Sequence, residues 1–173
     1  MKFLLGIFVG IILTGAAIVS YFVFGFAPVA VADHPMPFER AIAERAQDAH
    51  LARQPQPDSP VPADEANLVS GAYVYGMDCA GCHGVPGKPK SDMSTAMYPP
   101  PPQFFSGSHA HNHPINETHW DVVNGIRLTG MPSFQGILSE TEGWQVSEVL
   151  ANATSLPDAA KAALASGDSA PAK

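Results

Sequence analysis

The distribution of apolar and charged positions divides the chain into an apolar N-terminal stretch, a polar proline-rich stretch and a region of helical periodicity. Residues 3–26 contain no charged side chain. At about 1.5 Å per residue, a helix of these 24 residues would be roughly 36 Å long, enough to cross a hydrocarbon core of about 30 Å. The pattern therefore predicts a transmembrane anchor within residues 1–32.

A signal sequence is the alternative interpretation of this stretch. Ala30-Val31-Ala32 is a small-x-small sequence that signal peptidase could cut before Asp33. The apolar core of a signal peptide is usually only about 7–15 residues long, so the length favours an uncleaved anchor. Lys2 is the only charged residue before Asp33, and it favours a cytoplasmic N-terminus.

Residues 33–63 combine a helical pattern with a proline-rich one. Apolar and charged positions alternate with helical spacing over residues 37–53, which predicts an amphipathic helix with Pro37 in its first turn. Such a helix could lie on the membrane surface, dock on a partner subunit or act as a solvated spacer. Four prolines within residues 54–63 favour extended chain, so we predict a semi-rigid linker. The helical pattern rests on Phe38, Ile42, Arg45 and Ala49.

Three further helices are predicted over residues 64–157, which indicates an all-α domain. The first runs from about Asp64 to Asp78, the second covers residues 116–127 with Asn116 as its N-cap, and a capping box at Ser139-x-x-Glu142 opens the third. We expect Pro157 to end the regular structure and residues 158–173 to form a flexible alanine-rich tail with at most a short helix. The expected apolar positions are Leu68, Gly71, Ala72 and Tyr75, then Trp120, Val123 and Ile126, and finally Trp144, Val146, Val149 and Leu150.

The candidate chemistry is concentrated in a C-x-x-C-H sequence formed by Cys79, Cys82 and His83. This spacing is typical of covalent haem attachment, in which both thiols bond to the haem and the histidine binds its iron. A zinc site is an alternative, but pairing these cysteines with His109 and His113 needs a gap of 26 residues, well beyond the usual spacing. A redox dithiol is another, but the βαβ pattern that carries such motifs is missing.

A cluster of histidines follows along the chain, formed by His109, His111, His113 and His119. We interpret it as a polar loop with incidental histidines rather than a metal site.

The overall charge limits the class of partner. The formal net charge is −7, and it becomes −8 for the part after residue 32 because Lys2 is the only charge before Asp33. This balance argues against nucleic acid as a partner and fits either a basic docking face on a partner or simple solubility.

Three features together resemble class I cytochromes c. Gly71 and Tyr75 precede the C-x-x-C-H sequence at the positions where that family has a close-packed glycine and an aromatic residue in its first helix. Gly130-Met131-Pro132 is similar to the distal-ligand loop of bacterial short class I cytochromes and of related c-type oxidase subunits. In the family, the glycine lets the first helix cross the C-terminal helix, where Val149 would be its partner.

The resemblance implies a class I cytochrome c fold around one covalent haem c. Cys79 and Cys82 would carry the haem, His83 and Met131 would be the axial ligands of its iron, and Tyr75 and Pro132 would pack against it. A backbone carbonyl in the proline-rich loop 84–103 would accept the proton of the other histidine nitrogen. Phe104 and Phe105 would cover the haem, although core packing explains them equally well. The weaker candidates for the sixth ligand are Met77, Met93 and Met97.

The implied function is single-electron transfer rather than enzymatic catalysis, because two axial ligands leave no open position on the iron. The partners would be membrane-bound donor and acceptor complexes of a respiratory chain, such as a quinol-oxidising complex, a terminal oxidase or a photosynthetic reaction centre, and the chain could be a fixed subunit of one. The haem domain would be periplasmic, on a single-pass anchor in a bacterial cytoplasmic membrane. The alternatives are a haem enzyme or gas sensor with a displaceable methionine, and a structural membrane subunit.

Overall fold

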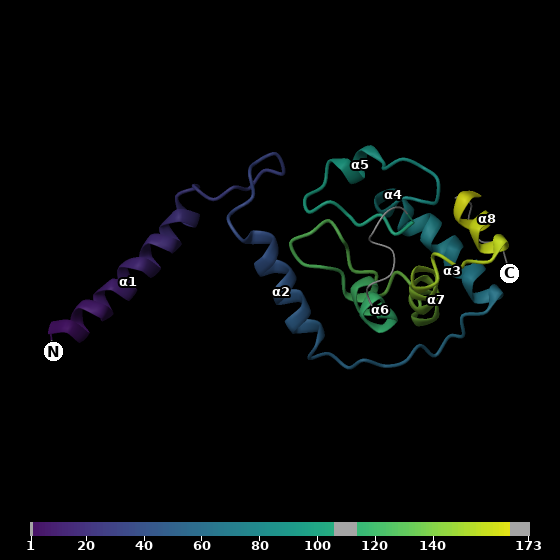
Figure 1. Cartoon of the computed structure of the whole chain (residues 1–173), viewed down its shortest axis with the longest axis horizontal. Coiled ribbons are helices and arrows are strands. Elements are labelled where there is room, and N and C mark those ends of the chain that lie inside the picture. Colours follow the sequence, from purple (N-terminus) through teal and green to yellow (C-terminus); the bar gives the residue numbers. More distant parts are fainter. Residues whose placement is uncertain (1, 106–113, 167–173) are drawn as a thin grey trace. The chain divides into compact units, whose positions relative to one another are not determined.

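The computed structural model describes residues 2–105 and 114–166, and the regular structure in these ranges is helical, as predicted (Figure 1). Two compact units divide the chain, Met1–Ala52 and Arg53–Lys173. The helices are α1 (Lys2–Val23), α2 (Glu39–Leu51), α3 (Glu65–Asp78), α4 (Ala80–His83), α5 (Asp92–Thr95), α6 (Ile115–Asn124), α7 (Glu140–Ala151) and α8 (Asp158–Ser166).

Helix α1 has the composition expected for an apolar span. It is 22 residues long, and no residue in it is buried within the protein. Among the described residues it is the one helix whose length and apolar composition suit a membrane crossing, a test that an N-terminal signal sequence also passes. The helix is therefore a candidate membrane span.

Helix α2 is shorter than the predicted range of residues 37–53. Phe38 adopts a left-handed conformation with φ of 64° at the N-cap position, so Pro37 lies outside the helix and the prediction for it was wrong. The Glu39 carboxylate accepts a hydrogen bond from the Met36 N–H at 2.8 Å, which fixes the chain entering the helix. The apolar side chains of Phe38 and Ile42 are 79% and 66% exposed.

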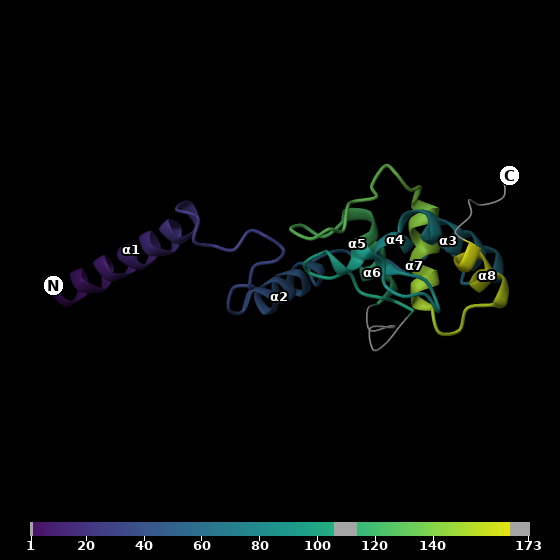
Figure 2. The ribbon, with the colours of Figure 1, turned by 90° about the horizontal axis from the view of Figure 1, so that it is seen from above.

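The second unit is built on α3, against which α7 and α8 both pack (Figures 1 and 2). Gly71 lies at the crossing with α7, as predicted. A Cβ atom at this position would collide with the Gln145 carbonyl and lie 3.0 Å from Cγ2 of Val149, the expected partner. The Gln145 amide also donates to the Asn67 side chain at 2.8 Å, which fixes the register of the crossing.

The N-termini of α3 and α7 are both capped by the predicted residues. The Asp64 carboxylate accepts from the Asn67 N–H at 2.9 Å and starts α3. The Ser139 hydroxyl accepts from the Glu142 N–H at 3.3 Å, and the Glu142 carboxylate accepts from the Ser139 N–H at 2.8 Å. This reciprocal arrangement is the capping box expected from the sequence.

Helix α6 differs from its prediction in its bounds and in its buried face. Pro114, not Asn116, occupies the N-cap position, because its fixed φ suits a helix start and it has no N–H to satisfy. The helix ends at Asn124, since Gly125 takes a φ of 69° that few other residues adopt. Val122 is the buried residue of this helix, whereas Trp120 and Val123 are half-buried.

The segment predicted as a flexible tail forms α8 as far as Ser166. Its Ala160 and Leu164 are almost fully buried, and the helix packs on α3. Pro157 precedes this helix instead of ending the regular structure. Small alanine side chains explain the difference, because they let a short helix approach α3 closely while carrying a weak hydrophobic signal in the sequence.

Candidate haem site

The two cysteines lie at the junction of α3 and α4. Cys79 ends α3, and its carbonyl accepts hydrogen bonds from the N–H groups of Cys82 at 3.1 Å and His83 at 2.9 Å. These bonds form a single helical turn, so three functional side chains leave one compact piece of backbone. Both thiols are free, with Cys79 buried and Cys82 half-buried.

His83 is oriented by a hydrogen bond and by stacking. Its Nδ1 lies 2.9 Å from the Pro102 carbonyl, and its ring stacks on Phe104 with centroids 4.8 Å apart. A carbonyl can only accept, so Nδ1 carries the proton and Nε2 keeps its lone pair free for a metal. Burial lowers the pKa of His83, an effect that the Pro102 hydrogen bond opposes, and the ring is thus neutral at neutral pH.

The resemblance to class I cytochromes c implied that a carbonyl in the loop 84–103 would hold this histidine, without indicating which one. The structure assigns the role to Pro102. This is the contact by which an outer residue orients a ligand histidine and fixes its tautomer.

Tyr75 connects α3 to the chain that follows His83. Its side chain is fully buried, its hydroxyl donates to the Gly84 carbonyl at 2.8 Å, and its ring meets Phe105 edge-on at 5.3 Å. Burial raises the pKa of this hydroxyl, so it remains a donor. The haem-edge role expected for Tyr75 stays a prediction.

Gln103 was not identified from the sequence. It is 7% exposed, and its Nε2 lies 3.0 Å from the Cys82 carbonyl, 3.0 Å from the Ser94 hydroxyl and 3.1 Å from the Pro101 carbonyl. A lone glutamine in a proline-rich loop gives no sequence signal, because its partners are mostly backbone carbonyls.

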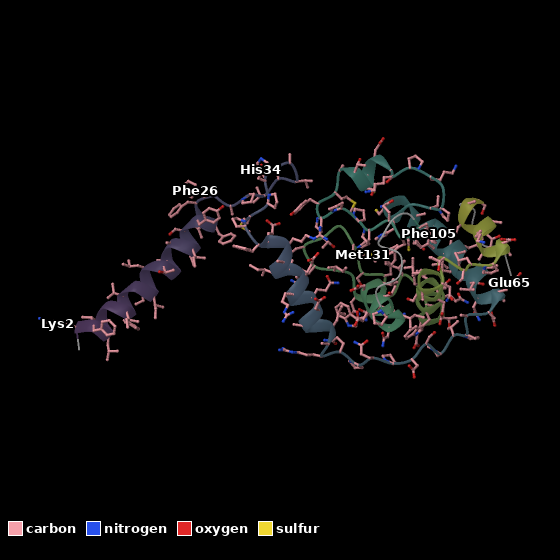
Figure 3. The ribbon with its side chains drawn as sticks, in the orientation of Figure 1. Lys2, Phe26, His34, Glu65, Phe105 and Met131 are labelled. Carbon is pink, nitrogen blue, oxygen red and sulfur yellow. The ribbon has the colours of Figure 1, made fainter. Side chains whose placement is uncertain are left out.

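Met131 lies on the loop between α6 and α7 (Figure 3). The loop is closed by backbone, since the Ile126 N–H donates to the Met131 carbonyl at 3.2 Å. The Met131 N–H in turn donates to the Thr129 hydroxyl at 3.0 Å. The Met131 side chain is half-buried against the core cluster that includes Tyr75 and Cys79.

Two further contacts define this loop. Gly125 is tightly packed, because a Cβ atom there would lie 2.7 Å from the carbonyl carbon of Pro132. The methyl end of Met97 lies directly against Gly130, so the loop after α5 contacts the Met131 loop. Met97 is therefore the competitor for sixth ligand that the structure places next to Met131, whereas Met77 and Met93 are 50% and 62% exposed.

The geometry argues against the redox-dithiol alternative for the cysteines. Burial, with smaller effects from Asp78 and Cys82, raises the pKa of Cys79 to about 12, whereas a redox dithiol needs a readily ionised thiol. Within residues 2–105 and 114–166, no group of three or more His, Cys, Asp or Glu side chains is arranged to hold a metal ion. His109, His111 and His113 lie outside the described residues.

His119 differs from His83 although both histidines are in aromatic contacts. Its ring stacks on Trp144 with centroids 3.7 Å apart and an interplanar angle of 6°. Its Nδ1 is buried and forms no hydrogen bond of good geometry in the described part of the chain, and burial lowers its pKa, an effect that the nearby Gly143 backbone and Glu140 oppose. His119 is therefore a packing residue of the α6–α7 contact.

Comparison with protein families agrees with this site. The model of the family described as Cytochrome c matches residues 68–154, which is half of the chain, and the chain belongs to this family. Comparison with curated proteins found no match, and comparison with solved structures found none. Membership implies covalent haem c and single-electron transfer as the activity.

The residues present fit that group. Two free thiols flank one helical turn, and a neutral imidazole follows with Nδ1 engaged and Nε2 available. The Phe104 ring stacks on His83, and Tyr75, which contacts Phe105, donates to the Gly84 carbonyl directly after the turn. Sulfur, imidazole and aromatic groups are the partners that a c-type haem requires.

Proposed function

We propose that this cytochrome c is a membrane-anchored carrier of single electrons with one haem. Cys79 and Cys82 hold the haem covalently, His83 and Met131 are the axial ligands, and Tyr75 and Pro132 pack against it. The observation that carries the proposal is the bond from His83 Nδ1 to the Pro102 carbonyl, since it leaves Nε2 as a fixed, neutral metal ligand beside two free thiols. When bound, the haem supplies a one-electron Fe(III)/Fe(II) couple.

The chain's own residues support transfer rather than catalysis. A ligand on each side of the iron leaves no position for a substrate, and a thioether favours Fe(II), which gives a high potential. The segment that follows His83 and the loop that carries Met131 are in contact through Met97 and Gly130. We propose that the domain comprises residues 64–157 extended by α8.

The proposed location is the outer face of a bacterial cytoplasmic membrane, with α1 as an uncleaved anchor and residues 33–63 as tether. The length and apolar composition of α1 support the anchor. A tether raises the effective concentration of membrane-bound partners. We propose as partners a quinol-oxidising complex and an oxidase or a photosynthetic reaction centre, with the chain either mobile between them or a fixed subunit of one.

The test is a redox titration of the full-length protein purified from membranes, followed by optical spectra with and without CO. One covalent haem with a single high-potential transition and no CO binding to the reduced form is the expected result. A low potential or prompt CO binding would instead indicate an open or labile sixth position, as in a haem enzyme or gas sensor.

A further inference from the structure

A buried side-chain amide lies between the two backbone segments that hold His83. Gln103 is adjacent to Pro102, whose carbonyl accepts from the imidazole. The same amide reaches the Cys82 carbonyl, in the peptide group that joins Cys82 to His83, and the Pro101 carbonyl, in the peptide group that joins Pro101 to Pro102. It thus connects the segment that carries the ring to the segment that orients it.

The contacts of Gln103 fix its position tightly. An amide nitrogen has two hydrogens, and the three acceptors within 3.0–3.1 Å of Nε2 therefore share them. One of the acceptors, the Ser94 hydroxyl, is itself 1% exposed. A Cβ atom at Gly84 would lie 2.6 Å from Oε1 of Gln103, so the amide oxygen lies close to the residue that follows His83.

A second set of bonds joins the same parts. The Ser91 hydroxyl donates to the Gly81 carbonyl at 2.6 Å and accepts from the Ser94 N–H at 3.0 Å. Helix α5 is thereby attached to the C-x-x-C-H turn on one side and to Gln103 on the other. The connection depends on side chains of three polar residues rather than on a sheet or a long helix.

We propose that Gln103 is a positioning residue that sets the hydrogen bond between His83 Nδ1 and the Pro102 carbonyl, and through it the reduction potential of the haem iron. This inference rests on the proposed ligation by His83. A stronger Nδ1–H···O bond makes the imidazole a better electron donor, which favours Fe(III). Loss of the Gln103 bonds loosens the Pro102 carbonyl and favours Fe(II).

The test compares Gln103→Met with the parent in the haem-loaded, full-length protein. Methionine keeps the side-chain length and removes both donors. The expected result is a change of about threefold or more in the Fe(III)/Fe(II) equilibrium constant toward Fe(II), together with a shifted His83 Nδ1–H resonance in the reduced protein. An unchanged potential, or a changed potential with an unshifted resonance, would overturn the proposal.

The matched control is Ser147→Ala. Ser147 is fully buried in α7, and its hydroxyl donates to the Gly143 carbonyl at 2.8 Å within the same helix. This variant also loses a buried hydrogen bond, so its melting temperature falls while its potential stays at the parent value. If Gln103→Met behaves in the same way, Gln103 has a structural role alone and the proposal is wrong.

Two measurements keep the test decisive if Gln103→Met fails to fold. In the parent, the side-chain amide protons of Gln103 are expected to exchange slowly with solvent, and fast exchange would contradict the proposal. Ser94→Ala removes one acceptor and should shift the potential in the same direction by a smaller factor, whereas no shift would count against the network. Failure of the proposed function is distinct, since it would appear in the parent as a missing His/Met spectrum.

Discussion

The chain after α4 and the loop after α6 hold the two proposed axial ligands, His83 at the end of α4 and Met131 within the loop, by different means. The first orients the His83 side chain itself, through the Pro102 carbonyl and the Phe104 ring. The second fixes the backbone of Met131 through Ile126 and Thr129 and leaves the thioether to packing. An imidazole has a second nitrogen that can be held, whereas a thioether has only weak acceptor capacity, so its position depends on the loop.

The two described histidines of the second unit also differ in how the side chain is held. Both have a pKa lowered by burial and both stack on an aromatic ring. Nδ1 of His83 lies 2.9 Å from the Pro102 carbonyl, whereas Nδ1 of His119 forms no hydrogen bond of good geometry in the described residues and is only near the Gly143 backbone. Burial and stacking are therefore common to both histidines, and the short hydrogen bond to Nδ1 distinguishes the proposed ligand His83 from His119.

The largest expected effect is that of His83→Ala. It should abolish the low-spin six-coordinate spectrum and lower the yield of haem-containing protein by about tenfold or more. His119→Ala is the matched control and should keep the spectrum while destabilising the α6–α7 contact. Haem content per chain and optical spectra measure both. Loss of the spectrum in the His119→Ala protein would contradict the assignment of His83 as the ligand and His119 as a packing residue.

Met131→Ala should have the next largest effect, without loss of the fold. The reduced protein should bind CO, and the potential should fall by on the order of 0.1 V or more, within the roughly 0.8 V that axial ligands span. Met97→Ala should leave both properties unchanged. The reverse result would make Met97, which contacts Gly130, the sixth ligand.

Gly71→Ala tests the crossing of α3 with α7. The added methyl group collides with the Gln145 carbonyl, so the free energy of unfolding should fall by about 1–3 kcal/mol, although alanine is the better helix former. Gly81→Ala is the control, because a Cβ atom there meets nothing within 4 Å. Urea unfolding of the haem-loaded proteins measures the difference. Equal stability of the two variants would exclude a close crossing at Gly71.

The smallest effect concerns the pH dependence of stability. Burial lowers the pKa of His119 in the folded protein. As the pH falls, His119 is therefore protonated in the unfolded chain before it is protonated in the folded protein. The free energy of unfolding then decreases below the ordinary histidine pKa of about 6.5. The Gly143 backbone and, to a smaller extent, Glu140 act in the opposite direction. His119→Phe should retain the contact with Trp144 and lose less stability than the parent between about pH 7.5 and about pH 5.5. Identical slopes would contradict this.

The sequence predicted those parts of the fold that depend on local rules. Asp64 and the Ser139–Glu142 pair are recognised by helix-capping patterns, and both caps are present. Gly71 was expected at a close crossing because the family resemblance supplied its partner helix. In these cases a few residues at a fixed spacing determine the contact.

Other features depend on contacts between distant segments and could not be predicted. Two of the three acceptors of Gln103, at Cys82 and Ser94, lie on other segments of the chain, and nothing in the sequence pairs them with it. Val122, not Val123, is buried in α6 because it joins the core cluster, to which several helices contribute. Helix α8 carries small residues whose burial depends on α3 being close.

The crossing of α3 with α7 has a consequence for the order of folding. The contact between Gly71 and Gln145 closes a loop that contains the C-x-x-C-H turn, α5, α6 and Met131. Bringing together chain positions 74 residues apart costs about 4 kcal/mol of loop-closure entropy, before any constant term. Such non-local pairing slows folding relative to a local helical hairpin. Haem attached to Cys79 and Cys82 within this loop, and bound by the proposed ligands His83 and Met131, would shorten the free chain and so lower this entropic barrier.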